Sequence, residues 1–533
     1  MSKLEDMSEK YEAEQMQEAG HHEVLAAEQQ GLKRDLRLRH MIMIAISGTI
    51  GTGLFLTSGT TIATAGPGGA LLAYGVIGLW LVFVCQAIGE VATLLPLPGA
   101  FNAWGGRVFD EAFSFQMTWM YFINWALTIP AELSASAIIV EFWLPENSTF
   151  PSWVVPLIII LVMIAINLVG VKAYGELEYW FSVLKVLTII MFIICGILVD
   201  AGVLGRVKYG MNAWHVDGAP FKGGLLGFIT TLVSVGYAYG GTEMTGVTAA
   251  ESRNPHKHVP KAVNTVLLRI AFFYLVSVFL LGSIIENSDP SLLNAGSSAA
   301  KAPFTIVFTK AGINAAANYM NAVVFTSVFS AINSDFYVAT RMLLSLSRNG
   351  IVTAFSCLSM ITIFVGSGVV FQWFVSIIGS IIFQSWILIL LLHFRFRYCW
   401  KKQGRPVSDL PYVSWGYPYG NILATVIGCC CIIATWYLSV INPPHYPGDG
   451  ATPDKLRVYQ KARDSYSQGL LSAWFPWVCS ACLFFGYKFV CKTKLIKAEE
   501  ADLDTGRFVP TESDKEDLKP HGPMWKRILQ YLI

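Results

Sequence analysis

Residues Ser47–Phe55 read SGTIGTGLF and lie within the first long apolar segment of the chain, residues 41–63. A run of about 20 apolar residues is long enough to cross a bilayer as a helix. Three glycines in six positions, Gly48, Gly51 and Gly53, each weaken that helix relative to alanine. A broken helix persists inside a membrane only where its freed backbone groups face protein, ligand or water. This stretch therefore predicts a membrane span that is interrupted.

Two roles are open for this first interruption. The backbone N–H groups of Gly51, Thr52 and Gly53 would lie at the N-terminus of a half-helix, where the helix dipole favours a carboxylate. Alternatively, the glycines only allow a neighbouring helix to pack closely. A second interrupted span in the same chain favours the binding role.

The second interruption is Gly236–Glu243, which reads GYAYGGTE in the apolar segment 224–249. Gly240 and Gly241 break the helical pattern, and Glu243 places an acid in the middle of the span. Freed carbonyl groups at this point would accept hydrogen bonds from an ammonium group. Glycine-interrupted spans at matching positions of two five-span halves indicate an inverted-repeat transporter with a binding site at the midplane. One break suits an anion and the other a cation, so the pair fits a zwitterion.

The composition places the chain among membrane proteins. Of its 533 residues, 54% are hydrophobic and 14% are charged, whereas soluble domains carry about 25% charged residues. The formal net charge of +2 argues against nucleic-acid binding. No cluster of histidines lies within a span, so neither a metal site nor a membrane-embedded enzyme is expected, and no cofactor is implied. The cysteines lie in or beside spans, which excludes a disulfide framework.

Hydropathy predicts a polytopic, all-α protein with about twelve spans. They are expected near residues 41–63, 70–95, 115–140, 153–171, 179–199, 224–249, 264–286, 318–346, 351–369, 373–394, 419–441 and 469–490. Basic residues just before the first span place the N-terminus in the cytosol, and the even count returns the C-terminus there. The chain is thus divided into a disordered cytosolic tail (1–39), a transmembrane domain (40–492) and a cytosolic C-terminal tail (493–533).

Within the C-terminal tail, the acidic composition of residues 499–521 predicts disorder. The only glycosylation sequon begins at Asn147, in a loop that the topology places outside the cell.

Several spans carry polar or ionisable residues. Glu132 and Lys185 lie inside the third and fifth spans, and an ionisable group at such depth is a functional candidate. Glu90 lies nearer a span end and is expected to have a structural partner. In the eighth span, Ser330 and Asn333 either line an ion route or link helices by hydrogen bonds.

Several motifs occur together in the order of a known family. They are Gly48–Phe55, Gly89-Glu90, Pro130–Leu133, Tyr239–Glu243 and Asn333-Ser334. On these motifs the chain resembles the fungal (yeast-type) amino acid permeases of the amino acid–polyamine–organocation superfamily, over about residues 39–492. The resemblance implies a five-plus-five inverted-repeat fold with two extra C-terminal helices. It also implies import of L-amino acids at the plasma membrane by proton symport and alternating access.

The resemblance also assigns roles to particular residues. By similarity, Thr52 and Gly53 would hold the substrate carboxylate, and backbone around Tyr239 and Gly240 would hold the amino group. Tyr237 would occupy an aromatic gate position. Lys185 would couple transport to protons, because it matches a lysine that stands where sodium-coupled relatives bind sodium. The acids Glu132 and Glu243 match positions that are acidic across relatives of different specificity, so the side chain of the substrate stays open.

The sequence departs from the family pattern at Gly350-Ile351, where a longer cytosolic loop is missing and the following span is short. Whether the chain is an active transporter, a transport-defective amino acid sensor or a carrier of amines such as γ-aminobutyrate therefore stays open. The partners implied are an amino acid, protons, the lipid bilayer and ubiquitin-ligase adaptors on the cytosolic tails.

Overall fold

A computed structural model describes residues 50–97, 99–145, 150–151, 153–169, 171–205, 207–252, 254–293, 302–343, 367–441 and 453–509. Within these ranges every regular element is a helix. The predicted glycosylation site at Asn147 and the departure at Gly350-Ile351 lie outside the described residues.

The first described element contains the later part of the first predicted span and nearly all of the second. The π-helix η1 (Gly53–Thr57) continues into α3 (Ser58–Leu94), whose backbone leaves the helical region at Gly66, with φ of 75°. Glycine adopts this left-handed conformation without the steric cost that a side chain would add. Pro67 follows and cannot donate a helical hydrogen bond. The element therefore consists of two helices that meet at a kink.

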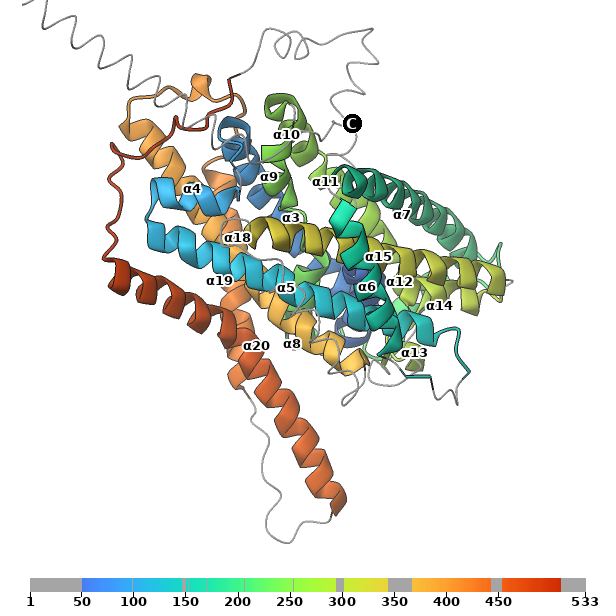
Figure 1. Ribbon diagram of the computed structural model, residues 1–533. Helices are drawn as coiled ribbons and strands as arrows, with labels where there is room; N and C mark the ends of the chain where they lie inside the picture. The colour runs from blue at the N-terminus through green and yellow to red at the C-terminus, as the bar shows by residue number, and fades with distance from the viewer. Residues whose placement is uncertain are drawn as a thin grey trace, which may run out of the picture.

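The remaining helices pack into a bundle, from which one end of the last helix projects (Figure 1). The first half continues with α4 (Phe101–Val108), α5 (Glu111–Glu141), α6 (Val154–Val169) and α7 (Val171–Asp200). The second half contains α8 (Gly224–Tyr239), α9 (Met244–Thr248), α10 (Pro255–Asn264), α11 (Val266–Arg269), η4 (Ile270–Leu275), α12 (Val276–Ile284), α13 (Pro290–Leu293), α14 (Pro303–Lys310), α15 (Asn314–Leu343), α18 (Ser367–Lys402), α19 (Tyr419–Val440) and α20 (Pro453–Cys491).

Nine of the described helices are long and apolar enough to cross a membrane. The difference from the twelve predicted spans has three sources. The first two spans are joined through the kink at Gly66, and α6 contributes only a shorter apolar helix. Most of the predicted span 351–369 lies outside the described residues. The prediction of a polytopic helical membrane protein is confirmed.

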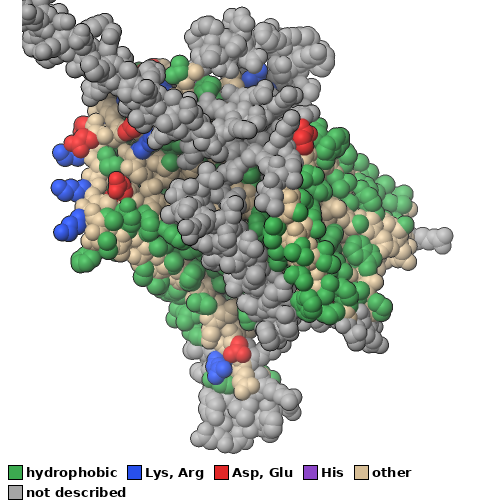
Figure 2. All heavy atoms as spheres, viewed as in Figure 1, with side chains coloured by type: hydrophobic (Ala, Val, Ile, Leu, Met, Phe, Trp, Pro, Cys, Tyr) green, Lys and Arg blue, Asp and Glu red, His purple; other side chains and the backbone are tan. Residues whose placement is uncertain are grey.

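The helices differ in how deeply they are buried. In its most apolar stretch, α5 buries 89% of its residues, whereas α20 buries 17%. On α7, large apolar side chains such as Trp180, Leu187 and Ile194 are exposed, and Figure 2 shows hydrophobic side chains gathered on that side of the bundle. Lipid can cover this apolar surface, whereas α5 lies at the centre where a site can form.

Glu90 has the structural partners that were expected. It is fully buried, and Arg397 on α18 donates a 2.8 Å hydrogen bond from Nη2 to its carboxylate. His393 Nε2 lies 3.0 Å from Oε1 of Glu90, and the Ser414 backbone N–H donates to Oε2 at 2.8 Å. This cluster links the end of α3 to α18 and to the loop that follows it.

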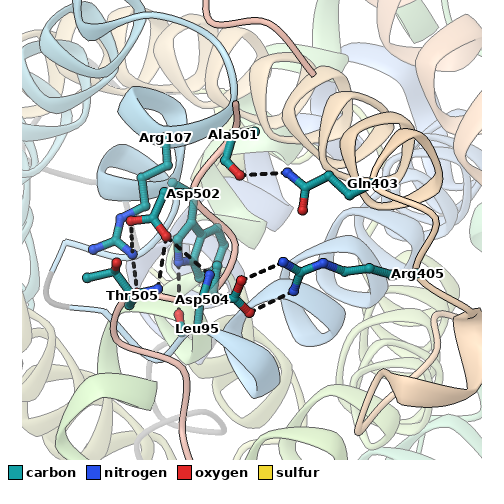
Figure 3. A network of polar contacts seen from close by, with 9 residues as sticks. Leu95, Arg107, Gln403, Arg405, Ala501, Asp502, Asp504 and Thr505 are labelled. Carbon is teal, nitrogen blue, oxygen red and sulfur yellow. Dashed lines mark hydrogen bonds and ion pairs between the residues drawn. The ribbon is translucent and has the colours of Figure 1, made fainter. Parts of the chain in front are cut away.

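Residues 493–509 form a strap that folds back onto the helix ends, which we call the C-terminal strap. The expectation of disorder is therefore wrong for residues 499–509. Leu503 is 1% exposed, and both guanidinium Nη atoms of Arg405 donate to the Asp504 carboxylate, at 2.7 and 2.5 Å (Figure 3). The carboxylate of Asp502 pairs with Arg107 of α4 at 3.6 Å. Two of the acids that suggested a solvated tail, Asp502 and Asp504, instead pair with arginines outside the strap.

Candidate substrate site

The second interruption lies where the sequence predicted it. Helix α8 ends at Tyr239, and α9 begins only at Met244. Between them, Gly240 is extended with ψ of 145°, and Gly241 has φ of 93°, a conformation that favours glycine. The carboxylate of Glu243 accepts hydrogen bonds from the Gly241 N–H and from the Trp386 indole, both at 3.4 Å. Glu243 thus stabilises the break from within.

The described part of the first interruption begins at Ile50. Ile50 and Gly51 are not helical, and the Gly51 carbonyl accepts hydrogen bonds from the N–H groups of Leu54 and Phe55, each at 3.2 Å. The chain then enters η1. Gly51–Gly53 thus lie at a helix start, where the first N–H groups have no partner within the helix itself.

The two glycines of this helix start have different surroundings. A Cβ atom at Gly53 would lie 2.3 Å from the Cα atom of Ala238 on α8, whereas one at Gly51 would meet nothing closer than 3.9 Å. Gly53 therefore serves the close approach of two helices, which was the alternative interpretation of the glycines. A Cβ atom at Gly51 would make only an ordinary van der Waals contact with Ala331, and Gly51 lines the cavity described next.

A cavity lies between the two breaks. Seven of the predicted site residues line it: Gly51, Thr52, Gly53, Glu132, Tyr237, Gly240 and Gly241. The helices α15 and α18 complete the wall, with Ala331, Ser334 and Asp335 from the former and Ile378 and Ile382 from the latter.

Tyr239 and Glu243 are the predicted binding residues that do not line this cavity. The Tyr239 hydroxyl donates to the Tyr74 carbonyl at 3.1 Å, and its ring packs on Tyr274 with centroids 4.4 Å apart. Both Tyr239 and Glu243 are buried. Their side chains shape the break from behind, while the neighbouring glycine backbone faces the cavity.

One carboxylate oxygen joins three elements at the cavity. Oε1 of Glu132 on α5 accepts hydrogen bonds from the Thr52 hydroxyl at 2.5 Å and from the Tyr237 hydroxyl at 2.9 Å. The two hydroxyls are 2.8 Å apart. The other carboxylate oxygen, Oε2, is buried and has no hydrogen-bond partner among the described residues. Glu132 thus ties both broken spans to the central helix and keeps one acceptor unused.

A second polar cluster lies next to this one. The ammonium group of Lys185 on α7 is buried, and it interacts electrostatically with Glu178, Glu132 and Asp335. Ser330 and Asn333 of α15 donate to Glu178 at 2.8 and 3.0 Å. These two residues therefore link helices by hydrogen bonds, which was one of their two expected roles. None of the three residues Lys185, Ser330 and Asn333 lines the cavity.

The sequence prediction missed Glu178, and it placed Asp335 only in the same polar cluster as Ser330 and Asn333, without a role of its own. Glu178 precedes Lys185 by seven residues, which places both on one face of a helix. That spacing was visible in the sequence. Among the described residues, no group of three or more His, Cys, Asp or Glu residues is arranged to hold a metal ion.

Comparison with known proteins decides the family. The sequence matches the amino acid permease family over residues 40–355 and 351–459. The chain belongs to this family. The two matched segments meet at residues 351–355, next to the departure noted in the sequence, so the permease pattern is interrupted there.

Three relatives show how broad this permease likeness is. A lysine-specific permease of Lactococcus lactis is 40% identical over 500 residues, which cover 89% of this chain and 93% of that protein. A histidine permease of the same organism is 38% identical over 496 residues, covering 89% and 98%. Cationic amino acid transporter 1 of Schizosaccharomyces pombe is 33% identical over 515 residues, covering 92% and 84%. The resemblance to fungal permeases is confirmed, and the permease belongs with transporters rather than enzymes.

Proposed function

We propose that this permease imports L-amino acids across the plasma membrane together with protons, by alternating access, with both termini in the cytosol. The observation that carries the proposal is the cavity between two helix breaks. At one end, the N–H groups of Gly51–Gly53 suit the α-carboxylate, because a helix start favours an anion. At the other, the backbone beside Gly240 suits the α-ammonium group. An amino acid zwitterion, whose carboxylate and ammonium groups are attached to the same carbon atom, fits between them.

The buried Lys185 cluster supports proton coupling. An ionised side chain inside a membrane is costly and is kept where it has a function. Lys185 interacts with Glu132, and Glu132 is hydrogen-bonded to Thr52 and Tyr237 on the two broken spans. A change in the protonation of Lys185 therefore acts on a residue that holds both breaks. In this proposal, proton movement and substrate movement share the Glu132 carboxylate.

Transport into sealed proteoliposomes tests the proposal. Under an imposed inward proton gradient, the purified permease should accumulate a labelled amino acid above its external concentration, and a protonophore should abolish this accumulation. Lys185→Ala should abolish uphill accumulation but retain exchange of labelled for unlabelled substrate. Uphill uptake that needs no proton gradient, or that Lys185→Ala leaves unchanged, contradicts proton symport. Saturable binding without any flux would instead identify a sensor.

A further inference from the structure

We infer that Asp335 accepts the cationic side chain of the substrate, so that the permease selects amino acids of the lysine and arginine type. The inference rests on the proposed function and adds the class of substrate. It is carried by the carboxylates that face the cavity.

The charged side chains on the cavity wall are all of one sign. Glu132 and Asp335 line the cavity, and none of the described lining residues is Lys, Arg or His. Asp335 is 3% exposed, and its Oδ2 atom is buried with no hydrogen-bond partner among the described residues. A buried acceptor without a partner is unfavourable. An ammonium or guanidinium group of a substrate would supply the missing donor.

Asp335 is better placed than Glu132 for this contact. Glu132 is held by Thr52 and Tyr237, next to the breaks that receive the α-carboxylate and α-ammonium groups. Asp335 lies on a different helix, α15, one turn after Ala331, and both of these residues line the cavity. A substrate whose α-groups occupy the breaks can therefore extend its side chain toward α15.

The rest of the wall suits the stem of such a side chain. Ile378 and Ile382 lie one turn apart on α18, and Met244 and Trp125 also line the cavity. Lysine and arginine carry an apolar stem with a charge at its tip. Apolar walls for the stem and a carboxylate for the tip together match that chemistry.

Charge balance within the cluster agrees with this assignment. Asp335 interacts electrostatically with Glu132 on α5 and with Glu178 and Lys185 on α7, and it also acts on Tyr237 of α8. Among these described groups, three carboxylates face one ammonium. When all four groups are ionised, the cluster carries a net charge of −2, so two positive charges are needed to balance it. A cationic amino acid supplies one, and a co-transported proton supplies the other, whereas a neutral amino acid leaves one charge unbalanced.

Competition by lysine and norleucine tests the inference, because norleucine has the same stem without the ammonium group. Uptake of labelled lysine into proteoliposomes is measured with each competitor. In the wild type, lysine should compete at a concentration at least about 10-fold lower than norleucine, as expected for a charge-assisted hydrogen bond. Asp335→Asn should reduce this ratio to about 2-fold or less, measured with labelled norleucine as the reporter. Asp335→Glu should retain the preference.

The control is the same substitution at Asp200, which lies at the end of α7 outside the cavity lining. Asp200→Asn should keep the wild-type preference. A preference that survives Asp335→Asn, or an equal loss of both substrates in that variant, overturns the inference. A wild-type permease that carries norleucine but not lysine also overturns it, while the proposed function stands. A wild-type permease that carries no amino acid overturns the proposed function itself.

Discussion

The hydroxyl of Thr52 lies 2.5 Å from Oε1 of Glu132, so the start of η1 is bonded to the middle of α5. Thr52→Val removes this donor and keeps the shape of the side chain. A hydrogen bond to a charged group contributes about 1.5–3 kcal/mol to the stability of the folded state, so we expect a lower melting temperature in detergent. We also expect a weaker affinity for substrate, because Glu132 is no longer tied to the start of η1. Equilibrium binding of a labelled amino acid measures this change. Thr52→Ser keeps the hydroxyl and should bind as the wild type does; equal loss in both variants would show that the methyl group matters instead.

Gly53 and Gly51 form a matched pair of positions two residues apart. Gly53→Ala places a Cβ atom 2.3 Å from the Cα atom of Ala238, so the backbone of η1 or α8 has to move. Overpacking of this kind costs about 1–3 kcal/mol or more. We expect a lower melting temperature in detergent and reduced uptake. Gly51→Ala, whose Cβ atom has 3.9 Å of room, should fold and melt normally. Equal melting temperatures for the two variants would contradict the close packing at Gly53.

The buried pair of Glu90 and Arg397 predicts a large loss of stability on truncation. Removing one partner of a buried ion pair leaves the other charge uncompensated, which costs about 3–5 kcal/mol. Glu90→Ala should therefore lower the melting temperature of the detergent-solubilised permease strongly. Asp464 provides the control. It pairs with Arg463, and the two side chains are 72% and 57% exposed, respectively. Asp464→Ala should change stability by about 1 kcal/mol or less.

The sequence predicted what local patterns determine. The break at Gly240 and Gly241 was visible because paired glycines weaken a helix wherever they occur. The membrane-spanning helices followed from apolar length. The close approach of Gly53 to Ala238 was not visible, because it depends on which helix packs there.

The same distinction explains the errors. The role of Glu178 depends on Ser330 and Asn333, which lie more than 150 positions away in sequence. The tail around Asp504 was expected to be disordered because its composition is acidic, and its partner Arg405 lies 99 positions earlier. Composition shows that charges are present, and only the fold shows whether they are paired.

The pairing of Asp504 with Arg405 predicts how attachment of the C-terminal strap depends on pH. Hydrogen bonds from Arg405 hold the pKa of the Asp504 carboxyl below its ordinary value. A group whose pKa is lowered by attachment stabilises the attached state at pH values above its ordinary pKa, about 3.9, and this contribution is lost as the pH falls through the lowered value. Between pH 7 and pH 5 the strap should therefore stay attached, and it should loosen only below about pH 4.

Hydrogen exchange of the peptide covering residues 494–509, corrected for the intrinsic rate at each pH, measures how firmly the strap is attached. Arg405→Ala should raise exchange already at pH 7, whereas Arg463→Ala, which changes an exposed arginine outside the strap, should not. Loosening of the wild-type strap between pH 7 and pH 5 would mean that a group other than Asp504 controls its attachment.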